Sequence, residues 1–147
     1  MTKFLVVNGP NLDMLGKRDP AHYGTTTLEE LEGRMGKRAQ ELGVELVFCQ
    51  SSFEGELVNF VNRSSPEADG IIINPAGLTR VGYSLLDACI DSRLPVAEVH
   101  LSNIQRREPW RADSIFSKVA EATVAGMRWF GYVAALEYLT AVVNKEV

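Results

Sequence analysis

The sequence predicts an α/β fold in which a five-stranded parallel sheet lies between two layers of helices. Two observations carry this prediction. Apolar runs of strand length alternate along the chain with segments whose apolar residues recur at helical spacing, and such alternation is typical of a parallel sheet with helices on both faces. In addition, the run Asp69–Asn74 contains three consecutive isoleucines without polar alternation, as expected for a strand buried on both faces.

Length and composition are those of an ordinary globular protein. The 147 residues are 46% hydrophobic and 23% charged, so we expect residues 1–147 to form one domain with a substantial core. A net charge of −4 argues against nucleic acid or an anionic membrane as a partner. No apolar run approaches a membrane span, no signal-peptide pattern opens the chain, and the two cysteines lack CxxC spacing. We therefore expect a cytoplasmic protein with free, buried thiols.

The first predicted strand, Lys3–Asn8, leads into a polar loop that ends at Gly24. The loop is too rich in Gly, Pro, Asn and Asp for a helix or a strand. Polar loops that follow buried strands are where α/β proteins hold their functional residues. Gly16 and Gly24 flank the last part of the loop, so Lys17–Tyr23 could move as a lid.

The first predicted helix and the second predicted strand have clear signals. Thr27–Glu30 is a capping box, apolar residues then recur at helical spacing as far as Leu42, and Gly43 is a typical residue for a helix end. Val44–Cys49 predicts the second strand. Ser51–Glu54 is a further capping box, which predicts a short helix that ends near residues 64–66.

The remaining elements continue the alternation. The isoleucine-rich third strand is followed by a helix over Val81–Asp91 and by a fourth strand over Pro95–His100. A long polar connection over residues 101–117 comes next. Residues 123–130 are compatible with a strand or a helix, and we favour an edge strand because β-branched and aromatic residues flank a glycine. Tyr132–Val143 predicts the last helix. Five strands and four or five helices in this length predict a flavodoxin-like sheet of order 2-1-3-4-5.

This topology gathers three polar loops at the carboxyl edge of the sheet. They are the loops after strands one, three and four, which contain Asn11–Tyr23, Asn74–Arg80 and His100–Arg111. Ligands of open α/β sheets bind in the crevice at this edge. The sequence therefore predicts one polar cleft for a small molecule.

His100 and Glu98 are the first candidates for chemistry. Residues i and i+2 of a strand share a face, so the carboxylate of Glu98 could orient the imidazole and stabilise its charge for general acid–base catalysis. The alternative is a histidine at a strand end that bonds only to the backbone. We expect no metal, because no third ligand has usable spacing and the other histidine, His22, is on the lid.

Tyr23 is the second candidate. A phenol ionises near pH 10 in water and is a poor base unless a neighbour favours the phenolate. Arg18 is in the same short loop, and a guanidinium has this effect, so Tyr23 could remove a carbon-bound proton. The alternative is a tyrosine that only packs the loop onto the body of the protein.

Further polar groups surround these candidates. The amides of Asn11 and Asn74 suit a water or an oxyanion, although asparagine beside proline also forms turns. The backbone N–H groups of Leu101 and Ser102 could receive a carboxylate. The arginines of residues 106–111 form either a clamp for an anion or a polyol, or a solvated loop. No Gly-x-Ser-x-Gly, GxGxxG or Walker pattern occurs, so neither a serine nucleophile nor a nucleotide cofactor is predicted.

Several short motifs follow one another along nearly the whole chain. They are Asn8-Gly-Pro-Asn-Leu, Leu15-Gly-x-Arg18, Tyr23-Gly24, Gln50-Ser51, Glu54-Gly-Glu-Leu57, Asn74-Pro75, Glu98-Val-His-Leu-Ser-Asn103 and Arg107-Glu108 with Arg111. In combination they closely resemble type II 3-dehydroquinate dehydratases. The resemblance implies a lyase without cofactor or metal that eliminates water in trans from 3-dehydroquinate to give 3-dehydroshikimate, in the shikimate pathway or in quinate breakdown. It also implies trimers, four of which form a homododecamer.

The resemblance also implies roles for single residues. Tyr23 corresponds to the base, Arg18 to its activating partner and His100, with Glu98 behind it, to the acid that protonates the departing hydroxyl. Asn11 corresponds to the residue that steadies the enolate through a bound water. The positions that match substrate-binding residues, the last of them contributed by a neighbouring subunit, are Asn74, Leu101, Ser102, Arg111 and Asp87.

The chain departs from the family pattern after the third strand. Arg80 replaces a histidine that touches the ring hydroxyls of the substrate, Ala76-Gly77 reverses a small pair, and Ser52-Phe53 stands where Asn-His is common. Two alternatives follow: a paralogue that dehydrates a related cyclic hydroxyketone acid, or a non-catalytic binding relative. Retention of the base, its activator and the acid argues against the second, because a binding protein needs none of them.

Overall fold

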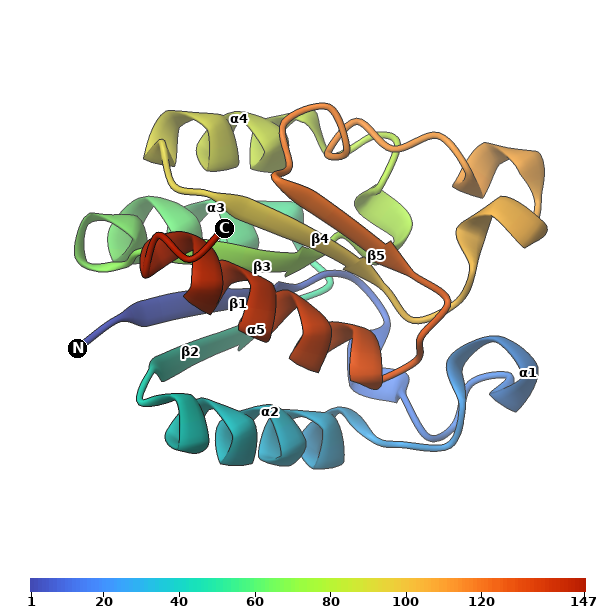
Figure 1. Ribbon diagram of the computed structural model, residues 1–147. Coiled ribbons are helices and arrows are strands. Elements are labelled where there is room, and N and C mark those ends of the chain that lie inside the picture. The colour runs from blue at the N-terminus through green and yellow to red at the C-terminus, as the bar shows by residue number, and fades with distance from the viewer.

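The computed structural model describes residues 1–147 and contains one five-stranded sheet. All strands are parallel and their order is β2-β1-β3-β4-β5, which confirms the predicted flavodoxin-like topology (Figure 1). The strands, in chain order, are β1 Lys3–Asn8, β2 Glu45–Gln50, β3 Gly70–Asn74, β4 Val96–His100 and β5 Ala122–Ala125.

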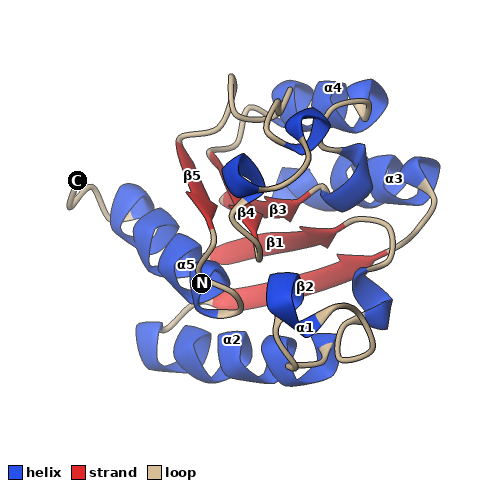
Figure 2. Cartoon of the chain, turned by 90° about the vertical axis from the view of Figure 1, so that its right-hand side faces the viewer, coloured by secondary structure: helices blue, strands red, loops and turns tan.

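Two layers of helices cover the sheet (Figure 2). Residues of α2 and α5 share one apolar core with one face of the strands, and residues of α3 and α4 share a second core with the other face. The isoleucines of β3 alternate between these cores, which explains why the strand has no polar positions. The helices are α1 Pro20–Tyr23, α2 Leu28–Leu42, α3 Glu54–Ser64, α4 Tyr83–Ser92 and α5 Phe130–Val143.

The cap predicted for α2 is present, whereas the one predicted for α3 is wrong. The Thr27 hydroxyl accepts a hydrogen bond from the Glu30 N–H at 3.1 Å, and Gly43 ends the helix with a left-handed φ of 72°. At α3 the N-cap residue is Phe53, whose side chain makes no capping bond. Ser51 lies further upstream, where its hydroxyl accepts from the Phe53 N–H and donates to Glu56.

The edge strand is shorter than predicted and the last helix is longer. β5 ends at Ala125 because the chain turns there, with left-handed φ values of 86° at Gly126 and 53° at Arg128. Phe130, assigned by its aromatic character to the strand, instead begins α5.

Both cysteines are free; burial raises the pKa of the Cys89 thiol to about 12, whereas Cys49 is only partly buried. No helix combines the length and the apolar character that a membrane crossing requires.

Candidate active site

A cavity of about 290 Å³ opens at the carboxyl edge of the sheet, where the loops after β1, β3 and β4 meet. This is the cleft that the topology predicted. Most of the predicted site residues form its wall. They are Asn11, Arg18, Tyr23, Asn74, Arg80, His100, Leu101, Ser102 and Arg111. Glu98 lies behind the wall, and Asp87 is exposed on α4 away from the cavity.

Tyr23 is presented to the cavity by the short helix α1, so the expectation that this loop contains no helix is wrong. Asp19 caps this helix by accepting a hydrogen bond from the Ala21 N–H at 2.9 Å, Pro20 occupies its first turn, and Gly24 ends it with a φ of 73°. The Tyr23 hydroxyl accepts a hydrogen bond from Arg18 Nη2 at 2.9 Å, and the Arg18 guanidinium carbon lies 3.9 Å from the ring centroid. The predicted pairing of Tyr23 with Arg18 is therefore present.

A second guanidinium, that of Arg107, contacts the same phenol and was not predicted as a site residue. Its Nη1 donates to the Tyr23 hydroxyl at 2.7 Å and to the Ser102 hydroxyl at 3.2 Å. The Tyr23 hydroxyl therefore accepts hydrogen bonds from two guanidinium groups, which place two positive charges beside one oxygen. The sequence signal was the basic cluster of residues 106–111, but its spacing did not show which arginine faces Tyr23.

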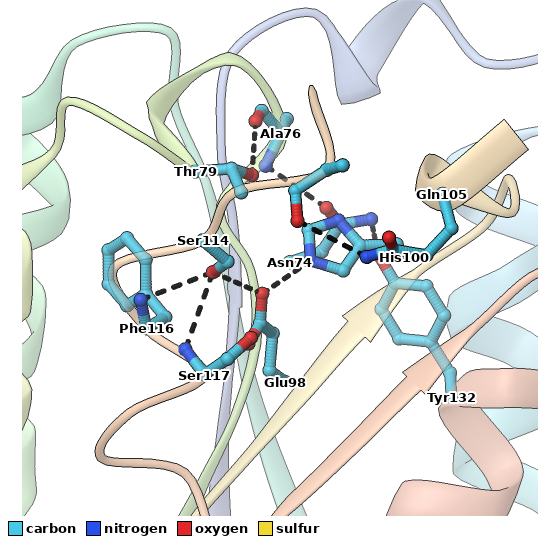
Figure 3. A network of polar contacts seen from close by, with 11 residues as sticks. Asn74, Ala76, Thr79, Glu98, His100, Gln105, Ser114, Phe116, Ser117 and Tyr132 are labelled. Atoms are coloured by element: carbon cyan, nitrogen blue, oxygen red, sulfur yellow. Dashed lines mark hydrogen bonds and ion pairs between the residues drawn. The ribbon is translucent and has the colours of Figure 1, made fainter. Parts of the chain in front are cut away.

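His100 and Glu98 form the buried pair that the strand pattern predicted. The two atoms His100 Nε2 and Glu98 Oε2 are 2.5 Å apart, and the side chains are 5% and 0% exposed. Figure 3 shows the Glu98 carboxylate between His100 on one side and Ser114 and Ser117 on the other. The histidine is thus bonded to a carboxylate, and the backbone-bonded alternative is wrong.

Two serines complete the surroundings of Glu98. The Ser114 hydroxyl donates to Oε2 and the Ser117 hydroxyl to Oε1, each at 2.6 Å. Burial raises the pKa of this carboxyl, but the hydrogen bonds from His100, Ser114 and Ser117 outweigh burial and hold the pKa below its ordinary value. Glu98 is therefore ionised. The serines were missed because they lie 16 and 19 residues away in an irregular connection.

An ionised Glu98 defines the proton arrangement of His100. The carboxylate accepts, so Nε2 carries a hydrogen, and Nδ1 makes no hydrogen bond within the protein. A neutral ring then presents an acceptor at Nδ1, whereas an imidazolium presents a donor. Only a protonated ring can give a proton to a ligand from Nδ1, because Nε2 is bonded to Glu98.

Asn74 is held in place from two sides. Its Oδ1 accepts from the Ala76 N–H at 3.1 Å, which is the turn-forming role, and its Nδ2 donates to the Tyr132 hydroxyl at 2.9 Å (Figure 3). That hydroxyl donates in turn to Asn8 Oδ1 at 2.7 Å. Tyr132 comes from α5, so this helix orients an amide in the cavity wall, a function that its apolar pattern did not reveal.

Free donors complete the wall. Asn11 has a left-handed φ of 69°, which places its side chain in the wall without a hydrogen bond to the protein. The backbone N–H groups of Leu101 and Ser102 likewise donate no hydrogen bond within the chain, although both residues are buried. Unpaired buried N–H groups are costly, so these two are suited to receive an anionic ligand.

The outer wall is cationic. Arg80 lies at the rim with its Nε 3.9 Å from Asp113 Oδ2, and Arg111 pairs with Glu108 and stacks on the Trp110 ring. No carboxylate is part of the wall, which suits a small anion. No three His, Cys, Asp or Glu side chains converge in a way that would hold a metal ion.

Comparison with known proteins gives a consistent result. The family model described as dehydroquinase class II matches residues 2–140. A 3-dehydroquinate dehydratase of Roseiflexus castenholzii is 47% identical over 137 residues, which is 93% of this chain and 87% of that protein. One of Pelotomaculum thermopropionicum is 45% identical over 139 residues, with coverage of 95% and 96%.

A solved structure extends the similarity to three dimensions. The crystal structure of type II dehydroquinase from Butyrivibrio crossotus superposes with a TM-score of 0.91 at 32% identity, covering 94% of this chain and 97% of that one. The family that the motifs resembled is thus the one that sequence and fold both match.

Proposed function

The chain belongs to the class II dehydroquinase family, and from this premise we propose that its cavity dehydrates 3-dehydroquinate to 3-dehydroshikimate. The observation that carries the proposal is that a candidate base and a candidate acid, each held by charged neighbours, lie in the wall of one cavity. A phenol held by two guanidinium groups and an imidazole held by a carboxylate both belong to its wall. A base and an acid on one small ligand are what an elimination of water requires.

Tyr23 is the base of the proposed reaction. Its phenolate oxygen takes a proton from the carbon beside the substrate ketone, and the electron pair of that C–H bond moves toward the carbonyl oxygen to give an enolate. Arg18 and Arg107 donate hydrogen bonds to this oxygen and orient it for the proton transfer. Asn11, whose amide is free, steadies the enolate through a bound water.

His100 is the acid. When the enolate returns to a ketone, the carbon–oxygen bond of the hydroxyl beyond the reacting carbon breaks, and the product is a conjugated enone. The leaving oxygen takes a proton from His100 and departs as water. The donor is Nδ1 of the imidazolium, because Nε2 is bonded to Glu98. Tyr23 then gives its proton to solvent and His100 takes a proton from solvent, which restores the starting state.

The substrate is held by groups that the protein leaves free or orients. The N–H groups of Leu101 and Ser102 bind the substrate carboxylate, since they lack acceptors in the chain. Asn74 and Arg111 bind ring substituents from the wall. The orientation of Asn74 by Tyr132 supports this role.

We propose that the chain acts as a homododecamer in the cytoplasm. Asp87 is exposed on α4, on the same helical face as Tyr83 and Ile90, which are 62% and 47% exposed. A face that combines apolar side chains with a carboxylate fits an interface through which Asp87 reaches a neighbouring site. The free thiols Cys49 and Cys89 suit a reducing compartment.

One assay tests the activity. Purified protein is mixed with 3-dehydroquinate, and the conjugated enone of the product is followed by its ultraviolet absorption. We expect product to form without added metal or cofactor. No product at high enzyme concentration would contradict the proposal and would favour a non-catalytic binding relative.

Arg80 favours one alternative, a paralogue for a related cyclic hydroxyketone acid. Its side chain is 55% exposed and its charge is only weakly engaged by Asp113, so it presents a large, permanent cation at the cavity rim. Comparison of kcat/KM for 3-dehydroquinate and for such acids tests this alternative. A clear preference for another acid would identify the paralogue.

A further inference from the structure

The lid carries Tyr23 on a short helix that contacts the apolar cores only through the partly buried Tyr23 ring. α1 has no buried residue. A second cavity of about 330 Å³ lies beside it, and residues of the lid and of the turn after β5, among them Ala21, His22 and Arg128, form its wall. Apart from the packing of the Tyr23 ring, the position of α1 therefore depends on individual polar contacts.

Arg128 makes one of these contacts. Its Nη1 donates to the carbonyl oxygen of Pro20 at 2.9 Å, across 108 residues of sequence. The same carbonyl accepts the Gly24 N–H at 3.0 Å, the bond that closes α1 behind Tyr23. A Cβ at Gly24 would come within 3.1 Å of Arg128 Nη1, so the guanidinium lies directly against the end of the lid.

Arg128 makes this contact from an unfavourable backbone conformation. Its φ is 53°, in the left-handed region that favours glycine. Its N–H donates to the Leu101 carbonyl at 3.0 Å, which anchors the residue to the loop after β4. No carboxylate lies within ion-pair distance of its guanidinium. A glycine would suit this backbone better but could not reach the lid.

From these contacts we infer that Arg128 is a positioning residue that latches the lid and so keeps Tyr23 and Arg18 over the cavity. The catalytic part of this inference rests on the proposed function, whereas the structural part does not. Without the latch the lid spends part of its time open, and the apparent affinity for substrate falls by the fraction of molecules that remain closed. Saturating substrate still closes the lid, so loss of the latch raises KM and leaves kcat nearly unchanged.

Kinetics of matched variants test the catalytic part. In Arg128→Gly the left-handed backbone is relaxed and the latch is lost. We expect KM for 3-dehydroquinate to rise about tenfold, as for a lid closed in roughly a tenth of molecules, with kcat within about twofold of the parent. Arg128→Lys keeps a hydrogen-bond donor, and its KM should lie close to that of the parent. Arg93→Gly is the control, because Arg93 has a φ of 60° at the end of α4 and makes no contact with the lid.

Hydrogen exchange of the free protein tests the latch without any turnover. In Arg128→Gly we expect the amides of residues 22–24 to exchange at least about tenfold faster while those of β1 are unchanged, and no such effect in Arg93→Gly. Unchanged exchange in the lid would overturn the latch, whether or not the protein is active. Faster exchange with an unchanged KM would overturn the role in positioning. A fully inactive parent would refute the proposed function alone, since exchange still decides the latch.

Discussion

Arg107 donates a hydrogen bond to the hydroxyl of Tyr23 at 2.7 Å, although 84 residues separate the two in the chain. Arg18, only five residues from Tyr23, bonds the same oxygen at 2.9 Å. One cation therefore moves with the lid, and the other belongs to the loop after β4. As a consequence, the phenol has both cations beside it only when the lid lies against the body of the protein.

The first prediction concerns this second cation. In Arg107→Lys the charge is kept, but a single ammonium cannot reproduce the guanidinium contacts with Tyr23 and Ser102. Because hydrogen bonds to charged groups contribute about 1.5–3 kcal/mol, we expect kcat/KM to fall about 10- to 100-fold. Arg106→Lys is the control, since Arg106 is exposed and bonds to neither residue. Equal rates for both variants would show that Arg107 has no part in activating the base.

The second prediction concerns the base itself. Tyr23→Phe removes the only oxygen that Arg18 and Arg107 share, and it leaves the ring to pack on the apolar core. We expect kcat to fall at least about a thousandfold, because no other group in the wall replaces a phenolate. Circular dichroism should show an unchanged fold. A residual rate within tenfold of the parent would assign the proton transfer to another group.

The sequence predicted those parts of the molecule that depend on local pattern. β1 has the predicted bounds, because a buried parallel strand is a continuous apolar run with polar residues at its ends. The pairs Tyr23–Arg18 and His100–Glu98 are close in sequence, so spacing alone brought their members together.

Contacts between distant residues could not be predicted in this way. Arg107, Ser114, Ser117 and Tyr132 reach their partners through the tertiary fold, and nothing in their local sequence distinguishes them from neighbours of the same type. The end of β5 was missed for a related reason. The turn after Ala125 uses left-handed backbone at Gly126 and at Arg128; the glycine was interpreted as part of the strand, and arginine is a residue type that carries no turn signal.

The third prediction tests how α5 orients the cavity wall. Tyr132→Phe leaves Asn8 Oδ1 and Asn74 Nδ2 without the hydroxyl that they share in a fully buried site. We expect the free energy of unfolding to fall by about 1–3 kcal/mol and KM to rise, since Asn74 is then held only by the hydrogen bond from the Ala76 N–H. Tyr138→Phe on the same helix is the control, because its hydroxyl makes no hydrogen bond within the protein. Equal stability of the two variants would contradict the network.

The fourth prediction tests the proposed interface on α4. Ile90→Glu places a charge on the half-exposed face that also contains Tyr83 and Asp87. We expect light scattering to show a dodecamer for the parent and smaller species for this variant, because an unpaired charge in an apolar contact is costly. Gln40→Glu on the exposed face of α2 adds the same charge and should leave the assembly intact. A monomeric parent would contradict the assembly itself.

The last prediction follows from the lowered pKa of Glu98. Its carboxylate accepts hydrogen bonds from His100, Ser114 and Ser117, so the native state binds a proton at this site less readily than the unfolded chain does. The resulting stability is fully present above the ordinary pKa of 4.5 and is lost as the pH falls through the lower native pKa. Glu98→Gln has no such group to titrate.

We therefore expect Glu98→Gln to be less stable than the parent by about 2 kcal/mol at pH 7, and the difference to shrink between about pH 5 and pH 3. Urea unfolding at one fixed protein concentration, followed by the fluorescence of the two tryptophans, measures this difference. Glu67→Gln removes an exposed carboxylate and serves as the control. A constant difference between parent and Glu98→Gln across this range would mean that Glu98 titrates normally. The hydrogen bonds from His100, Ser114 and Ser117 would then not stabilise the carboxylate, and the assignment of His100 as an acid held by Glu98 would lose its physical basis.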